Sequence, residues 1–268
     1  MLIINDRVIE IDNNGYLEQY ELENKLMHSL SRFYSDAIEL NNNVCLLYDQ
    51  MSPSSGDGLA TFYLGTLERM HKDYQAVLIL LCRGMQSQAR SIMRNLLEKT
   101  LIIKAVDKKQ ENLKSWVRTQ NRERNRTKET IKSGITHFTE EELVAMDLEE
   151  SKDIEKVSYS EWAKRAGMEF DYKVIYHIFC GDTHHTMSGM DKDAVADDNR
   201  FSGFSIAPNF EDIDYIITLA MHYLLMTVAI IAEHLKIDVE WIVPLQEKLD
   251  ALGFINLEKY GDSPSPEN

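Results

Sequence analysis

The chain has few residues that break helices. Its 268 residues include only 12 glycines and 5 prolines, and two of the prolines fall in the last six residues. This scarcity argues against a fold of many short strands and turns, and the many Leu, Met, Glu and Lys residues favour long helices. With 44% hydrophobic residues, a chain of this length can bury a substantial core.

Cysteine is scarce as well. The three cysteines, Cys45, Cys82 and Cys180, are odd in number and widely spaced. They do not form a disulfide framework, and no two of them have the spacing of metal ligands. We therefore predict buried free thiols in a reducing compartment.

Positive charge is also limited, because the formal net charge is −15. Such a surface repels phosphate backbones and anionic lipids, so we expect no general DNA binding and no membrane partner. The N-terminus lacks the basic and apolar regions of a signal peptide, and we expect a cytoplasmic protein. Residues 215–232 approach the length of a membrane span, but Asp212, Asp214 and Glu233 flank them and favour a buried central helix.

Apolar residues recur every three or four positions over most of the chain, which indicates helices. Gly84 either joins two helices tightly or sits within one longer helix. Thr139 to Glu142 resemble a capping box that opens an acidic helix, and residues 188–209 are expected to form a polar loop. The other predicted helices span residues 16–51, 58–82, 84–106, 113–132, 160–167, 171–187, 212–235 and 238–252.

The predicted fold is a single all-α domain, a multi-helix bundle, over residues 1–252. Residues 2–12 alternate between apolar and polar, and Asn13-Asn14-Gly15 is typical of a turn. This pattern predicts a short β-hairpin or strand within residues 1–15. Residues 253–268 form a C-terminal tail, disordered from about residue 261.

Three polar residues share one face of the helix predicted for residues 84–106. Arg90, Arg94 and Glu98 are spaced by four residues and border an apolar face that includes Met93 and Leu97. Arginine suits anion recognition, and a partly buried carboxylate suits proton transfer. The alternative is an ordinary ion pair within the helix.

A second group of polar residues lies at the end of the helix predicted for residues 171–187. It contains Tyr176 and the adjacent pair His184 and His185. Neighbouring side chains on a helix point about 100° apart, so one histidine at a time can face a given cavity. A neutral imidazole could act as a general base, with Tyr176 as a hydrogen-bond donor. The alternative is a polar helix C-terminus, where the helix dipole favours histidine.

The run from Leu81 to Glu98, with its Arg94-Asn-Leu-Leu-Glu98 motif, followed by Tyr176 and His184-His185, resembles an uncharacterised family of helical bacterial proteins. That family carries a domain-of-unknown-function label, and the resemblance covers residues 60–235. It implies a helical fold and a shared site at Arg94, Glu98 and His184 or His185. It implies no particular reaction.

The chain also resembles, more weakly, the helical ribonucleases of the HEPN superfamily. That resemblance implies a homodimer with a catalytic arginine and histidine in its cleft. The superfamily places the histidine four to six residues after the arginine, and no arginine of this chain has a histidine at that spacing.

Residues 113–132 are rich in basic side chains, and an acidic segment, residues 140–155, follows them. Either the basic helix binds nucleic acid, or the two segments form an antiparallel helical hairpin with opposite charges facing. The hairpin, or two solvated faces, is the simpler interpretation. The basic residues are Lys114, Arg118, Arg122, Arg124, Arg126, Lys128 and Lys132.

These patterns leave two hypotheses of different classes. In the first, the protein is a bacterial effector enzyme, a metal-independent ribonuclease or nucleotide hydrolase without a cofactor, and a homodimer. Arg94, Glu98, His184 and His185 would be catalytic, and Arg90 and Tyr176 would bind an RNA or nucleotide substrate. In the second, it is a non-catalytic helical interaction protein. Asp182, Glu98, His222 and Glu233 could join the histidines at a metal, but their spacing matches no metal motif and His222 is better explained as a core residue.

Overall fold

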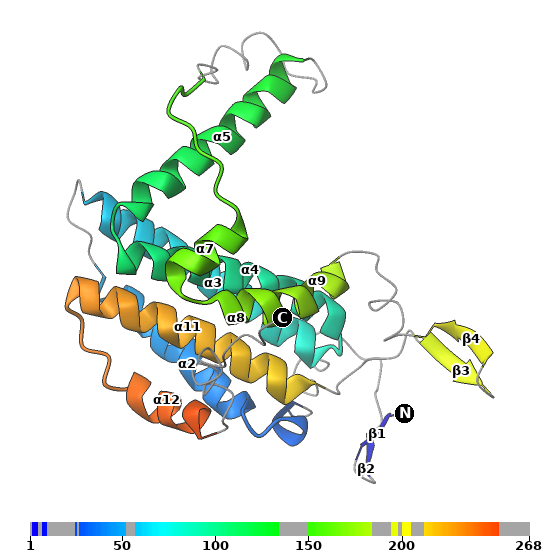
Figure 1. Ribbon diagram of the computed structural model, residues 1–268. Helices are drawn as coiled ribbons and strands as arrows, with labels where there is room; N and C mark the ends of the chain where they lie inside the picture. The colour runs from blue at the N-terminus through cyan, green and yellow to red at the C-terminus, as the bar shows by residue number, and fades with distance from the viewer. Residues whose placement is uncertain are drawn as a thin grey trace, which may run out of the picture. The chain divides into compact units, whose positions relative to one another are not determined.

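The computed structural model describes residues 2–4, 7–9, 25, 27–51, 57–133, 150–183, 194–197, 200–204 and 212–251. Helices dominate this part of the chain, which confirms the predicted all-α class (Figure 1). They are α2 (Tyr34–Tyr48), α3 (Gly58–Cys82), α4 (Gln86–Lys108), α5 (Asn112–Lys132), α7 (Tyr159–Ala166), α8 (Glu169–Asp171), the π-helical turn η1 (Tyr172–Tyr176), α9 (His177–Thr183), α11 (Ile213–Leu235) and α12 (Ile242–Asp250).

The chain forms two compact units, each held together by contacts among its own residues. Unit 1 comprises residues 1–97 and 176–268, and unit 2 comprises residues 98–175. Helix α4 begins in unit 1 and ends in unit 2. The single domain predicted for residues 1–252 therefore stays a prediction.

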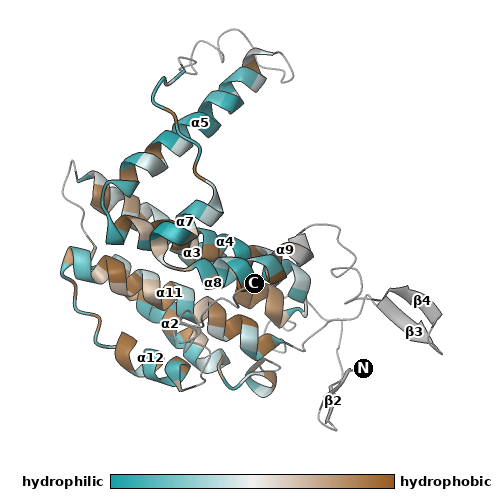
Figure 2. Cartoon of the chain, viewed as in Figure 1, coloured by the Kyte–Doolittle hydropathy of each residue, from teal (hydrophilic) through white to brown (hydrophobic). Residues whose placement is uncertain are grey.

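Helix α11 is the centre of unit 1. It contacts α2, α3 and α12, and nearly all its aliphatic side chains between Ile213 and Ala232 are buried. It is the one helix among the described residues that is long and apolar enough to cross a membrane, and 72% of its most apolar stretch is buried inside the protein. The expectation of a buried central helix is confirmed, and Figure 2 shows the apolar residues along it.

Local residue chemistry sets both ends of α3. Asp57 precedes the helix, and its carboxylate accepts hydrogen bonds from the backbone N–H groups of Leu59 and Ala60. An aspartate at this position occupies two of the backbone donors that a helix start leaves without partners. At the other end Gly84 has a φ of 65°, a conformation that glycine adopts without strain. Gly84 therefore joins α3 to α4 tightly, and the two are separate helices.

The helix predicted for residues 16–51 is interrupted. Residues 27–30 are helical, but residues 31–33 form a break before α2 begins at Tyr34. The Ser31 hydroxyl explains the break, because it accepts a hydrogen bond from the Phe33 N–H and donates one of 2.6 Å to Asp214 at the start of α11. A serine that bonds the local backbone competes with the helical pattern. Residues 16–24 lie outside the described residues.

In unit 2 an extended segment, residues 150–158, runs beside α5 (Figure 1). The Asn125 side chain donates to the Ser151 carbonyl at 2.8 Å and accepts from the Ser151 N–H at 3.0 Å. The Arg118 guanidinium donates to the Asp153 carboxylate at 2.6 Å. This end of the predicted acidic partner of α5 is thus extended rather than helical, since asparagine side chains of α5 hold its backbone. Residues 134–149, which link α5 to this segment and include the rest of the acidic stretch, lie outside the described residues.

Two antiparallel strand pairs complete the described elements. Strands β1 (Leu2–Ile4) and β2 (Arg7–Ile9) pair near the N-terminus, and β3 (Ala194–Asp197) pairs with β4 (Arg200–Phe204). The β3–β4 pair lies where only a polar loop was expected. Apolar residues stand among the polar ones in these two strands, and such residues favour strand formation. The predicted turn at residues 13–15 and the tail from residue 253 lie outside the described residues, so a hairpin with its turn at residues 13–15 remains a prediction.

The cysteines are free thiols, as predicted, but they are not all buried. Cys82 and Cys180 are half-buried, whereas Cys45 is exposed on α2. Cys45 directly follows the fully buried Val44, and the helical rotation of about 100° per residue turns it away from the core.

Candidate functional site

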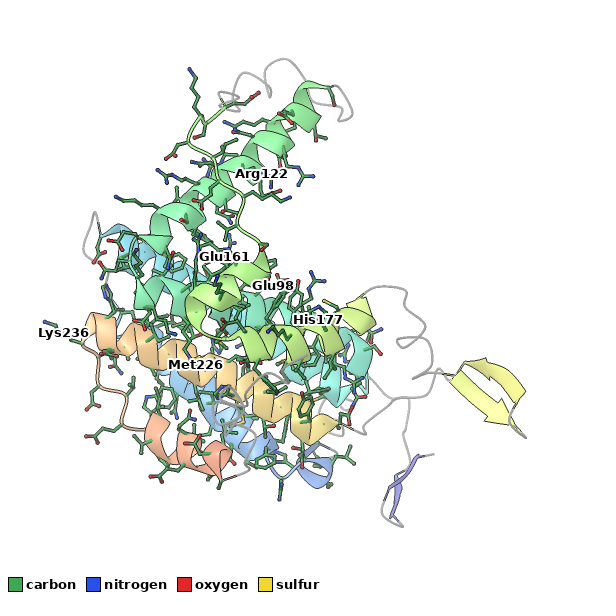
Figure 3. All side chains as sticks on the ribbon, viewed as in Figure 1. Glu98, Arg122, Glu161, His177, Met226 and Lys236 are labelled. Atoms are coloured by element: carbon green, nitrogen blue, oxygen red, sulfur yellow. The ribbon has the colours of Figure 1, made fainter. Side chains whose placement is uncertain are left out.

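The polar stripe predicted from the sequence lies along helix α4. Arg90 is buried, while Arg94 and Glu98 are half-buried (Figure 3 labels Glu98). Met93 and Leu97, between these positions, are completely buried. The four-residue spacing therefore places the three charged side chains along the border of the apolar face of α4.

Arg90 is engaged in an ion pair. Its side chain is only 7% exposed, and its guanidinium donates a hydrogen bond to the carboxylate of Asp212. Asp212 is 53% exposed and directly precedes α11. A carboxylate at the start of a helix is favoured by the helix dipole. The pair ties α4 to the central helix of unit 1, over 122 residues of sequence.

Arg94 and Tyr176 meet in space. The Cζ atom of Arg94 lies over the Tyr176 ring, 5.0 Å from its centroid. Tyr176 is 7% exposed, whereas Arg94 remains half-exposed to solvent. The structure thus brings one predicted site residue of α4 next to the last residue of η1, although nothing in the sequence required this. The π-helical turn is itself a feature that is common at functional sites.

The histidines near Tyr176 in the sequence include one that was not among the predicted site residues. The imidazole of His177, labelled in Figure 3, lies 6.0 Å from the Tyr176 ring and is exposed. Helix α9 ends at Thr183, immediately before His184 in the sequence. His184 and His185 lie outside the described residues, so their distance from Arg94 and Glu98 stays a prediction.

Sequence reasoning missed Gln86, the first residue of α4. Gln86 is 4% exposed, and its buried amide nitrogen has no hydrogen-bond partner within the described part of the chain. It lies four residues before Arg90 and so extends the same face of the helix. That spacing was the available signal, but a glutamine at the start of a helix usually points to solvent.

A second buried polar cluster lies between α2 and α3 in unit 1. The His71 imidazole is 5% exposed, and its Nε2 is 2.9 Å from the side-chain oxygen of Asn41, which also accepts from the Gln75 amide at 2.9 Å. Because the Asn41 oxygen is an acceptor, Nε2 carries a proton. Burial lowers the pKa of His71, and the hydrogen bond to Asn41 partly opposes that shift. The Tyr48 ring packs 5.7 Å from the imidazole.

Within the described ranges, no three His, Cys, Asp or Glu side chains are grouped so as to hold a metal ion. His222, weighed above as a metal ligand, is half-buried in α11 with its ring 5.5 Å from that of Tyr223. Glu233 is exposed near the other end of the same helix. The alternative metal site thus finds no support in these positions.

The arrangement of the stripe, with Tyr176 packed on it, can be compared with known proteins. A family model described as "Family of unknown function (DUF5677)" matches residues 61–201. The chain belongs to this family. The part matched to DUF5677 contains all six predicted site residues but not Asp212, the partner of Arg90. No curated protein and no solved structure matches the chain significantly.

Proposed function

We propose that this DUF5677 protein is a bacterial, cytoplasmic effector-type enzyme that cleaves phosphodiester bonds in RNA or a nucleotide. The observation that carries the proposal is the packing of Arg94 on Tyr176. It joins the arginine-bearing helix to the helical segment that leads directly to His184 in the sequence. An arginine, a carboxylate and a histidine are sufficient for metal-independent cleavage of RNA.

In the proposed reaction the 2′-hydroxyl of a ribose attacks the adjacent phosphorus. His184 or His185 takes the hydroxyl proton, the bond from phosphorus to the 5′-oxygen breaks, and a proton returns to that oxygen. The products are a 2′,3′-cyclic phosphate and a 5′-hydroxyl. Arg94 binds the phosphate and stabilises the charge that develops on it, and Tyr176 holds the guanidinium in place.

Arg90 and Glu98 take supporting roles in this proposal. Arg90 is bonded to Asp212 and nearly buried, so it fixes α4 rather than reaching a substrate. Glu98 lies one helical turn beyond Arg94 and is half-buried, which suits a carboxylate that orients the histidine. Two copies of the chain would form the working enzyme.

The test is cleavage of labelled RNA by the purified protein in the presence of EDTA. Arg94→Ala and His184→Ala should each lower the rate about 100-fold or more, as losses of a charge-stabilising or acid–base group do. Arg69→Ala and His28→Ala, at exposed positions elsewhere in unit 1, serve as controls of the same residue types. The fragments should end in cyclic phosphates. Equal activity of Arg94→Ala and the wild type would overturn the proposal.

A second candidate is a non-catalytic interaction protein, and the burial of the stripe favours it. Tyr176 is as buried as a core residue, and Arg90 is closed off by Asp212. On this hypothesis the polar residues only lock helix packing. Arg94→Ala would then lower the melting temperature, and the wild-type protein would cleave neither RNA nor nucleotides.

A further inference from the structure

Helix α5 is the most basic of the described helices in an acidic protein. It carries seven Lys or Arg and two Glu over Asn112–Lys132, a formal charge of +5 in a chain of −15. None of residues 112–131 is buried. Figure 2 shows the helix as mostly hydrophilic. A helix with no fully buried residue over this range leaves many of its side chains available to a partner.

The extended segment beside α5 occupies only one side of the helix. Its contacts reach Arg118, Asn121 and Asn125, which are spaced by three or four residues and so share one face. Two further contacts hold the segment, from the Glu155 N–H to the Arg118 carbonyl and from Arg165 to the Glu155 carboxylate. The rest of the helix circumference is left outside this contact.

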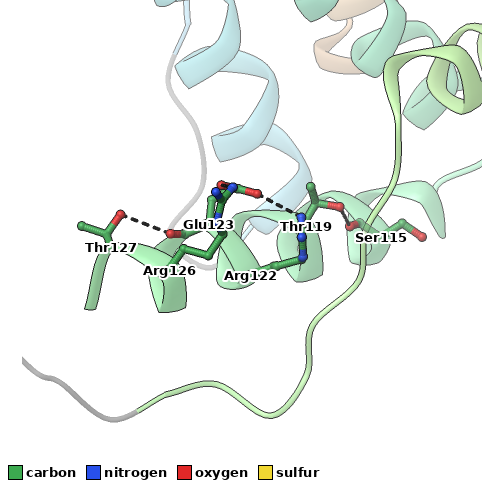
Figure 4. Close-up of polar contacts among 6 residues, drawn as sticks. All are labelled: Ser115, Thr119, Arg122, Glu123, Arg126 and Thr127. Carbon is green, nitrogen blue, oxygen red and sulfur yellow. Dashed lines mark hydrogen bonds and ion pairs between the residues drawn. The ribbon is translucent and has the colours of Figure 1, made fainter. Parts of the chain in front are cut away.

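Glutamate on α5 itself neutralises little of the remaining charge. Glu123 is shared between Arg122, at 3.2 Å, and Arg126, at 3.1 Å (Figure 4). Arg126 is still 66% exposed. Lys114 and Arg124 are exposed and take part in no ion pair with the described residues. Exposed ion pairs of this kind contribute little to stability. Their arginines can readily exchange the glutamate for another anion.

The composition of this surface distinguishes between classes of partner. A protein interface needs an apolar centre and is depleted in charge. On α5, Val117 is the one large apolar side chain that is exposed within the described part of the helix. Nucleic-acid interfaces are instead polar and strongly basic, with arginines that bind phosphate through two donors. Four of the seven basic residues of α5 are arginines.

We propose that the exposed basic side chains of α5, with Lys114, Arg124 and Arg126 as the main contacts, bind the phosphate backbone of RNA. The choice of RNA rests on the proposed function, for which α5 would be the element that captures the substrate. Binding through the backbone is independent of sequence and depends strongly on salt. The overall charge of −15 makes it dependent on this one helix.

The experiment measures binding of the intact protein to fluorescent 2′-O-methyl RNA by anisotropy, between about 50 and 200 mM salt, the range over which phosphate contacts are strongly screened. The 2′-methyl group blocks the proposed cleavage, so binding is read alone. The triple variant Lys114→Gln, Arg124→Gln, Arg126→Gln keeps good helix formers. It should weaken binding about tenfold or more and lower the slope of log K against log salt by about 2 to 3.

The matched control is Lys25→Gln, Arg69→Gln, Lys72→Gln, which removes the same charge from exposed positions of unit 1. Its affinity should stay within about twofold of the wild type, because it leaves the proposed contacts on α5 unchanged. Equal losses in both variants, or no binding by the wild type, would overturn the inference. So would an α5 variant that changes only the oligomeric state of the chain, which would assign these side chains to contacts with a second copy.

The two proposals fail separately. If the wild type binds 2′-O-methyl RNA through α5 but does not cleave unmodified RNA, the proposed function is wrong and RNA binding by α5 stands. If Arg94→Ala abolishes cleavage but the α5 variant neither weakens binding nor alters its salt dependence, the enzyme stands and RNA binding by α5 is wrong. Circular dichroism of each variant establishes that the helices are retained.

Discussion

The guanidinium of Arg94 lies over the aromatic ring of Tyr176, 5.0 Å from its centroid. The two residues are 82 positions apart in the sequence, and both belong to unit 1. A cation held over an aromatic face in a half-buried position is stabilised by the electron-rich face of the ring. This relationship is the physical basis of the proposed site and can be measured directly.

We predict an interaction free energy of about 0.5 to 1 kcal/mol between Arg94 and Tyr176. It would be obtained from a double-mutant cycle with Arg94→Met and Tyr176→Leu, from urea unfolding of the two single variants and the double variant. Tyr176→Phe retains the ring and should preserve most of the coupling. Additive single effects would mean that the contact contributes nothing to folding.

The Arg90–Asp212 pair predicts an asymmetry between its two partners. Asp212→Asn leaves a nearly buried guanidinium without its carboxylate and should lower the free energy of unfolding by about 1 to 3 kcal/mol. Arg90→Met should cost less, because methionine fills the apolar space and Asp212, 53% exposed, returns to water. Denaturant titrations at pH 7 test the order. A larger loss for Arg90→Met would show that packing of the arginine stem dominates.

His71 predicts a pH dependence of stability. Its pKa lies below the ordinary 6.5 in the folded protein because burial penalises the imidazolium, so the unfolded chain binds more protons. The contribution is fully present above pH 6.5 and is lost as the pH falls from 6.5 through the lowered folded pKa.

The measurement is the free energy of unfolding of the wild type and of His71→Gln between pH 7.5 and pH 5. The variant should show a shallower decline below about pH 6.5, where the unfolded imidazole gains its proton. His28→Gln, at an exposed position, serves as the control. Parallel curves for the wild type and His71→Gln would count against a neutral buried imidazole.

Two tyrosines of unit 1 should respond in opposite directions to loss of the hydroxyl. The Tyr48 hydroxyl is buried and has no hydrogen-bond partner among the described residues, so Tyr48→Phe should stabilise the protein by about 1 kcal/mol. The Tyr74 hydroxyl donates to the Ala37 carbonyl at 2.8 Å, so Tyr74→Phe should destabilise it by about 1 to 2 kcal/mol. Thermal unfolding of the two variants decides both signs, and destabilisation by Tyr48→Phe would contradict the first.

Periodicity predicted the long helices well because burial and helical spacing act together along each one. α3 and α11 coincide with the predicted ranges to within a few residues, since their apolar positions repeat over more than 20 residues. The break at Ser31 was not predictable, because it depends on a hydrogen bond to Asp214, far along the chain. Residues 150–155 were assigned to the acidic segment, but side chains of α5 hold them extended.

The candidate site was predictable only in its parts. Four-residue spacing placed Arg90, Arg94 and Glu98 on one face of α4, which is a local property. The partners of that face, Tyr176 and Asp212, come from distant segments whose positions depend on tertiary packing. The prediction that Cys45 is buried was also wrong. Cys45 follows a residue on the buried face of its helix, and the helical rotation turns it to the exposed side regardless of its residue type.

The place of α11 in the chain bears on how the protein is made. Its 23 residues, most of them apolar, are synthesised after α2 and α3, which pack against them. When this segment leaves the ribosome, α2 and α3 have already emerged and can cover it, whereas α12 follows later. A truncation before Ile213 would leave α2 and α3 without their cover, and such a product should aggregate rather than persist as a shorter bundle.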